Sequence, residues 1–138
     1  MQRIVFVSRA TAQAMAARLG WSVISISDPD EGPAQLAEGW DGVLRLEFMD
    51  AEEGSVHGPL FDEAMADDVL THAEQALEAG RSLLVHCHAG VSRSAAVAMA
   101  LGEFHGLPVF SGDVPLSPRY ALHNKHVYRL MHRAMAGY

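Results

Sequence analysis

The sequence predicts an α/β domain with a central, largely parallel sheet of about four to five strands flanked by helices. Short β-branched and apolar runs alternate along the chain with longer helical patterns, which is typical of this class. One run, residues 82–85, has no polar side to show to water, which favours a strand covered on both faces. The chain has 138 residues, of which 49% are hydrophobic and 20% charged, so we expect a single domain spanning residues 1–138.

Three strands and one helix are expected in the first half. The strands are short runs of β-branched, aromatic or alternating residues, at 4–7, 21–26 and 43–48. An alanine-rich stretch at residues 10–19, with Met15 and Leu19 four residues apart, predicts a helix that Gly20 ends. Residues 28–33 are rich in Asp, Pro and Gly and predict a loop.

The second half predicts three helices around the apolar strand. Residues 62–79 carry apolar side chains on one face and end at Gly80. Residues 94–104 are apolar almost all round, so we expect a buried helix that stops near Gly106. A last helix is expected beyond Pro118, reaching to about residue 136.

The composition disfavours several classes of partner. The net charge of −7 repels nucleic acid and anionic membrane surfaces, so neither is expected as a partner. The single cysteine excludes a disulfide within the chain and suits a reducing compartment. We see no signal peptide and no apolar run of about 18 residues, so we expect a cytoplasmic protein, and the oligomeric state stays open.

The stretch from Val85 to Ser94 carries the chemistry. It lies between the predicted buried strand and the predicted buried helix, where free N–H groups at the helix start form an anion site. A helix start and a nearby cation favour the thiolate form of a cysteine placed there, here Cys87. Arg93 can fold back over the same turn and bind two phosphoryl oxygens, while Gly90 lets the backbone aim its N–H groups inward. These parts are those that phosphoryl transfer to sulfur requires.

This stretch resembles a known family. His86-Cys87-x-x-Gly90-x-x-Arg93-Ser94 matches the signature of the protein tyrosine phosphatase superfamily at every fixed position, and the fuller string resembles its dual-specificity branch. The order of elements from Val23 to Phe104 is also similar to small prokaryotic members. The resemblance covers about three quarters of the chain and is strong around Cys87. It implies the fold of cysteine-based phosphatases and hydrolysis of phosphotyrosine, with phosphoserine and phosphothreonine as further candidates.

The resemblance also implies a role for each residue of the signature. Cys87 would attack phosphorus and form a phosphocysteine, and Ser94 would hydrogen-bond the thiolate as it leaves. His86 would orient the loop and support the thiolate through hydrogen bonding. The phosphate-binding residues would be the loop and its arginine, namely His88, Ala89, Gly90, Val91, Ser92 and Arg93.

A general acid is needed as well, because an alkoxide or phenoxide departs badly without a proton. The family supplies an aspartate from a loop upstream of the signature. Asp50 follows the alternating strand 43–48, where the dual-specificity pattern places this acid. Glu52, Glu53 and Asp62 remain as alternatives.

A metal site, a phosphoinositide substrate and a function other than phosphate-ester hydrolysis are the alternatives to this interpretation. Eight histidines, including His86 and His88 beside Cys87, suggest metal ligation, but adjacent residues in a tight turn seldom point at one ion, so no metal and no cofactor are expected. The loop carries no lysine, which favours a phosphorylated protein over a phosphoinositide as substrate. The alternatives in function are a phosphate-binding module without turnover and another cysteine-loop enzyme such as a sulfurtransferase.

Overall fold

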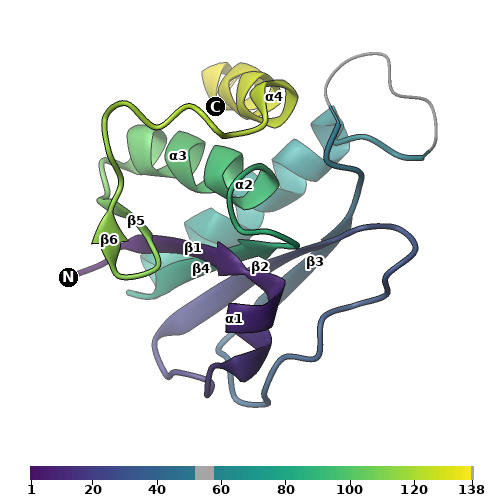
Figure 1. The fold of residues 1–138 in the computed structure, drawn as a ribbon. Coiled ribbons are helices and arrows are strands. Elements are labelled where there is room, and N and C mark those ends of the chain that lie inside the picture. Colours follow the sequence, from purple (N-terminus) through teal and green to yellow (C-terminus); the bar gives the residue numbers. More distant parts are fainter. Residues whose placement is uncertain (52–57, 138) are drawn as a thin grey trace.

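The computed structural model describes residues 1–51 and 58–137, and it is an α/β fold with a mostly parallel sheet (Figure 1). The sheet has six strands in the spatial order β3-β2-β4-β1-β5-β6. The strands are β1 (Ile4–Ser8), β2 (Trp21–Ser27), β3 (Val43–Glu47), β4 (Ser82–Cys87), β5 (Val109–Ser111) and β6 (Val114–Pro115). The helices are α1 (Arg9–Ala14), α2 (Glu63–Glu78), α3 (Arg93–His105) and α4 (Lys125–Ala136).

Helices cover both faces of the sheet. In Figure 1, α2, α3 and α4 lie above it and α1 lies below. The alternation of side chains along β4 matches this arrangement, since Leu83 and Val85 belong to the larger apolar cluster with α2, α3 and α4. Leu84 points to the opposite face and packs with Ala12 of α1 in a smaller cluster. The central strand is therefore buried on both sides, as its apolar sequence predicts.

The helices begin and end where capping residues stand. The side chains of Asp62 and Asn124 accept hydrogen bonds from backbone N–H groups in the first turns of α2 and α4. Gly106 ends α3 in the left-handed conformation, with φ of 66°. None of the helices among the described residues is long and apolar enough to cross a membrane.

Two features differ from the sequence prediction. The first helix ends at Ala14 instead of reaching residue 19, because Met15 is already extended and Leu19, 88% exposed, has no surface to pack against. The sheet has six strands where about four to five were expected, because β5 and β6 form a hairpin too short to leave a period-two pattern.

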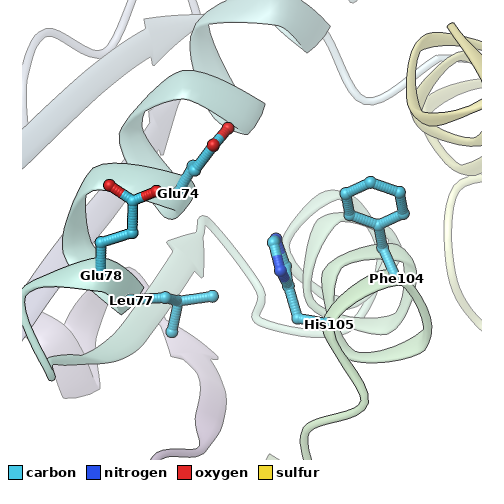
Figure 2. A pocket seen from close by; sticks show the side chains of 5 residues that line it. All are labelled: Glu74, Leu77, Glu78, Phe104 and His105. Atoms are coloured by element: carbon cyan, nitrogen blue, oxygen red, sulfur yellow. The ribbon is translucent and has the colours of Figure 1, made fainter. Parts of the chain in front are cut away.

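Parallel strands bring one edge of the sheet together. The carboxyl ends of β1, β2, β3 and β4 all reach this edge, at Ser8, Ser27, Glu47 and Cys87. At the far end of α3, a hollow of about 500 Å³ separates that helix from α2; Figure 2 shows Phe104 and His105 facing Glu74, Leu77 and Glu78 across it. Ligands of open α/β sheets bind at the carboxyl ends of the strands. We therefore expect a functional site at the edge where β1, β2, β3 and β4 end, and not at the hollow between α2 and α3.

Candidate active site

The segment from Cys87 to Arg93, which we call the cysteine loop, joins the carboxyl end of β4 to the start of α3. Cys87 ends the strand and is 1% exposed. Its Sγ lies 3.1 Å from Ser94 Oγ and accepts the N–H of Gly90 at 3.3 Å. The sulfur therefore sits at the floor of the loop with polar hydrogens directed at it.

Gly90 allows the loop to pass directly over the end of β1. Its φ is 75°, and a Cβ built on it would lie 2.4 Å from Ser8 N and 2.5 Å from Val7 C. Those atoms are backbone and cannot move aside. Glycine is therefore required here for two reasons, a left-handed conformation and the close approach of another strand.

The backbone carbonyls of the cysteine loop point outward. Three of them accept hydrogen bonds from outside the loop: His88 O from Arg9 N–H at 3.1 Å, Val91 O from the Tyr120 hydroxyl, and Ser92 O from Asn124 N–H at 3.1 Å. In a trans peptide the next N–H points the opposite way, so the amides of Ala89, Ser92 and Arg93 face away from these partners. Ser92, the N-cap of α3, makes no side-chain cap bond to the helix. These three N–H groups thus point to the inner side of the loop, an arrangement that can bind an anion.

Arg93 lies almost wholly inside the protein, at 3% exposure. Its Nη1 donates to Asp28 Oδ1 and to the carbonyl of Phe48, both at 2.8 Å. Its Nε is buried and has no hydrogen-bond partner among the described residues. A buried guanidinium N–H without a partner is costly, so this donor is available to an anion bound at the cysteine loop.

Asp50 contacts the cysteine loop from the end of β3. Its Oδ1 accepts hydrogen bonds from Ser92 Oγ at 2.7 Å and from Asn124 Nδ2 at 2.9 Å. Asn124 also donates to Ala51 O at 3.1 Å, is 2% exposed and caps α4. Two residues therefore hold one oxygen of the Asp50 carboxylate beside the loop.

His86 lies under the loop on the face of the sheet that α1 covers. Its Nδ1 is 3.4 Å from Cys87 O and its Nε2 is 2.6 Å from Ser25 Oγ, the residue opposite it on β2. Burial lowers the pKa of His86 to about 4, so the ring is neutral at pH 7. The carbonyl can only accept, which puts the proton on Nδ1 and makes the Ser25 hydroxyl the donor to Nε2.

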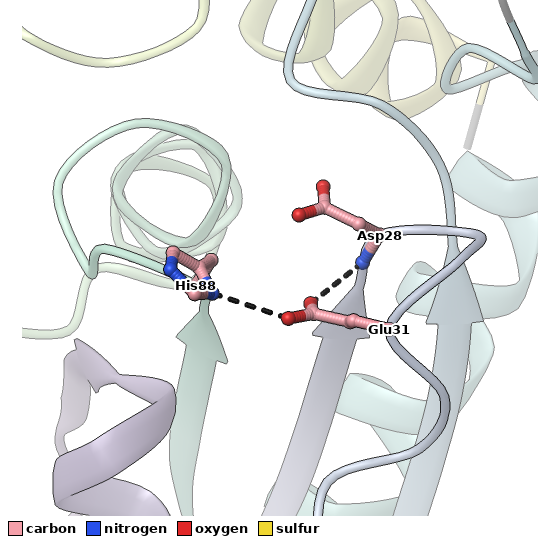
Figure 3. Close-up of side chains that lie close together, drawn as sticks. All are labelled: Asp28, Glu31 and His88. Atoms are coloured by element: carbon pink, nitrogen blue, oxygen red, sulfur yellow. Dashed lines mark hydrogen bonds and ion pairs between the residues drawn. The ribbon is translucent and has the colours of Figure 1, made fainter.

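Asp28, Glu31 and His88 form a cluster at the mouth of the loop (Figure 3). Glu31 binds Asp28 N–H at 2.7 Å through Oε1, lies 3.1 Å from His88 Nδ1 through Oε2, and pairs with Arg9 at 3.3 Å. Burial raises the pKa of Glu31, but these hydrogen bonds and charges outweigh it and hold the pKa below its usual range. Glu31 thus ties the exposed His88 to the loop after β2.

One ligand atom from each of Asp28, Glu31 and His88 lies within 4.8 Å of the others, the spacing that a metal ion would use. However, Arg9 and Arg93 already balance the two carboxylates. His86 and His88, considered above as metal ligands, turn to different partners on β2 and in the loop after it. The arrangement is that of an ion-pair network.

The structure gathers most of the residues expected from the sequence. Cys87, Arg93, Ser94 and Asp50 lie in or against the cysteine loop, and His86 lies beneath it. Among the alternative acids, Asp62 is occupied as the N-cap of α2, bound to Met65 N–H at 2.9 Å. Glu52 and Glu53 lie outside the described residues.

Sequence reasoning missed several residues that organise the site, namely Ser25, Asp28, Tyr120 and Asn124. Asp28 follows β2 as Asp50 follows β3, which was a usable signal that the segment after β2 is more than a turn-rich loop. Asn124 stands just before the last helix, and Asn is a preferred N-cap. Burial, with a contribution from Cys87, raises the pKa of Tyr120, which keeps its hydroxyl a donor to the loop.

No family model and no curated protein matches this chain. The chemistry of the site therefore has to be argued from its own geometry. A buried thiol, loop N–H groups that face away from the outer partners of the loop, a buried guanidinium and an adjacent carboxylate can bind a tetrahedral oxyanion and transfer a group to sulfur.

Proposed function

We propose that this protein is a cysteine-dependent phosphatase that hydrolyses phosphotyrosine in proteins, with phosphoserine and phosphothreonine as further candidates. The observation that carries the proposal is the position of Cys87 Sγ in a loop with three carbonyls engaged outward, next to Arg93, whose Nε is buried without a partner among the described residues. The signature from His86 to Ser94, which resembles that of the protein tyrosine phosphatase superfamily, supports the same conclusion.

In the first step the Cys87 thiolate attacks phosphorus opposite the leaving oxygen. The S–P bond forms as the P–O bond breaks, and the loop amides and Arg93 hold the three remaining oxygens. Asp50 gives its proton to the leaving oxygen. The anchoring of Asp50 supports this role, since Oδ1 is fixed by Ser92 and Asn124 while Oδ2 accepts no hydrogen bond from the described residues.

In the second step water attacks the phosphocysteine. Asp50, now ionised, takes a proton from this water, the new P–O bond forms and the S–P bond breaks. Ser94 Oγ, at 3.1 Å from the sulfur, can donate a hydrogen bond to the departing thiolate and lower the barrier to its release. Inorganic phosphate then leaves the loop and the cycle closes.

The charge and cysteine content bear on the setting of this reaction. With a net charge of −7 and a loop without lysine, a phosphorylated protein suits the site better than a nucleic acid or a phosphoinositide. A catalytic thiol that must stay reduced suits the cytoplasm, which we propose as the location.

The test is hydrolysis of p-nitrophenyl phosphate between pH 4 and pH 8 by the wild type, Cys87→Ser and Asp50→Asn. We expect turnover by the wild type, none by Cys87→Ser, and loss of about 10²- to 10⁴-fold in Asp50→Asn with disappearance of the basic limb of the pH profile. Glu78→Gln, at the opposite end of the molecule, is the control and should match the wild type.

Each other outcome has a distinct meaning. If Asp50→Asn behaves as the wild type, the acid is another residue. If phosphate binds to the wild type in calorimetry but no ester is hydrolysed, the protein is a phosphate-binding module. If neither occurs, sulfur transfer from thiosulfate is the next assay.

A further inference from the structure

A hollow of about 520 Å³ lies beside the cysteine loop. It is lined by Asp28, Pro29 and Asp30 from the loop after β2 and by Met49 and Asp50 from the loop after β3. Both of these loops belong to the edge of the sheet where the carboxyl ends of the strands meet. The hollow is therefore part of the same edge as Cys87.

Hydrogen bonds connect the walls of the hollow to the reacting groups. Asp28 accepts from Arg93 Nη1 at 2.8 Å and Asp50 accepts from Ser92 Oγ at 2.7 Å. The same guanidinium, in a side chain 3% exposed, keeps its Nε without a partner among residues 1–51 and 58–137. A phosphate bound by Arg93 would thus place the remainder of its substrate next to these walls.

The lining of the hollow is acidic and partly apolar. Three carboxylates face one hollow, and two of them already have hydrogen-bond donors in the cysteine loop or on Arg93. Asp30 is exposed and has no hydrogen bond or ion pair with any described residue. Pro29 and Met49 supply apolar surface beside it. Asp28 is paired with Arg93 and Asp50 carries the proton that it donates, so the Asp30 carboxylate is the group that opposes a phosphate dianion unless the substrate brings positive charge of its own.

We propose that this hollow selects phosphoproteins that carry lysine or arginine next to the phosphorylated residue. The aliphatic stem of such a side chain packs on Pro29 and Met49, and its cationic head meets the Asp30 carboxylate. The inference rests on the proposed phosphatase activity and adds the substrate class to it. The net charge of −7 acts in the same direction, since it steers basic segments toward the protein.

The experiment compares two synthetic phosphotyrosine peptides that differ by lysine or glutamate at the two positions flanking the phosphotyrosine. We expect kcat/KM to be about five- to tenfold higher for the lysine peptide, with the ratio falling as salt is raised. Asp30→Lys should bring the ratio to about one or reverse it. Glu78→Lys makes the same charge change at the far end of α2 and should leave the ratio as in the wild type.

The failures can be told apart. If the wild type hydrolyses p-nitrophenyl phosphate but shows equal kcat/KM for the two peptides, the substrate class is wrong while the phosphatase activity stands. If the preference exists but persists in Asp30→Lys, the hollow does not select the substrate and the inference falls. If the wild type hydrolyses nothing, both proposals fall together.

Discussion

The two ends of α3 differ in what their polar groups do, although a hollow lies near each of them. At the first end, Ser94 Oγ and the N–H of Gly90 contact the sulfur of Cys87, and Arg93 Nε is buried without a partner among the described residues. At the last end, Phe104 and His105 face Glu74 and Glu78 across a space of about 500 Å³ (Figure 2).

The hollows near the two ends of α3 do not differ in size. The hollow at the end of α3 is about as large as the one beside the cysteine loop, at about 500 Å³ against about 520 Å³. The difference lies in convergence: at the first end Gly90 N–H and Ser94 Oγ contact Cys87 Sγ, and Ser92 and Asn124 hold Asp50 against the same loop. Each end holds a buried nitrogen without a hydrogen-bond partner among the described residues, Arg93 Nε and His105 Nε2, so it is the gathering of polar groups from several elements that marks the first end as the candidate active site.

Arg93→Lys should have the largest effect on activity of the variants proposed for the first end of α3, where the cysteine loop lies. A lysine carries the charge but cannot donate to Asp28, to Phe48 O and to a phosphoryl oxygen in one plane, as Arg93 can. We expect kcat/KM for p-nitrophenyl phosphate to fall about 10³-fold, roughly 4 kcal/mol of transition-state stabilisation. Steady-state kinetics measures this, with circular dichroism to establish that the variant is folded. A loss below about tenfold would mean that the charge alone suffices.

Gly90→Ala tests the packing of the cysteine loop on β1. The added Cβ would lie 2.4 Å from Ser8 N, and φ would remain at 75°, so we expect a loss of about 3 kcal/mol in the free energy of unfolding. Gly80→Ala is the matched control, since Gly80 has φ of 80° but nothing within 4 Å of its Cβ; it should cost about 1 kcal/mol. Equal losses in urea unfolding would show that the contact with Ser8 is unimportant.

His86, in β4, and His105, at the end of α3, should differ in their effect on the stability of the protein in acid. Burial lowers the pKa of His86 to about 4, so the unfolded chain binds a proton there between about pH 6.5 and pH 4 and the folded chain does not. The stabilisation is therefore complete above pH 6.5 and is lost as the pH falls toward 4. Urea unfolding at pH 7 and pH 4 should show His86→Asn losing about 2 kcal/mol less than the wild type over this range.

His105→Asn is the comparison for the other end of α3. Burial also lowers the pKa of His105, but this residue is only half-buried, so its effect on acid stability should be smaller than that of His86. If the two variants lose stability in parallel with pH, burial of His86 does not lower its pKa more than partial burial lowers that of His105.

Asn124→Ala separates the positioning of Asp50 from the capping of α4. We expect a fall of about tenfold in kcat, confined to the basic limb of the pH profile, because Asp50 loses one of its two anchors. The lost N-cap should also cost about 1 kcal/mol of stability. Asp62→Ala removes the N-cap of α2 without touching Asp50, so it should cost similar stability and leave the pH profile unchanged. Identical pH profiles for the two variants would remove Asn124 from the account.

The sequence predicts the elements of this edge better than the contacts between them. The buried strand, the glycine turn and the buried helix around Cys87 follow from local patterns, whereas Asp50 as the acid is what the family resemblance implies and stays a prediction. The contacts of Asp28 with Arg93 and of Asn124 with Asp50 join residues 65 and 74 positions apart. No local pattern encodes which strand ends meet, and that depends on the order β3-β2-β4-β1. The predicted first helix is too long for a related reason. The spacing of Met15 and Leu19 suggests a helix up to residue 19, but Leu19 is exposed and no neighbouring surface packs against it.

The most direct test of the central claim is to trap the covalent intermediate on Cys87. The wild type and Ser94→Ala would be mixed with p-nitrophenyl phosphate, quenched in acid within milliseconds, digested and analysed by mass spectrometry. Since Ser94 lies 3.1 Å from the sulfur that must leave, the variant should accumulate one phosphoryl group on the peptide containing Cys87, together with a burst of nitrophenol. Turnover without phosphate on that peptide, unaffected by Cys87→Ser, would contradict the mechanism.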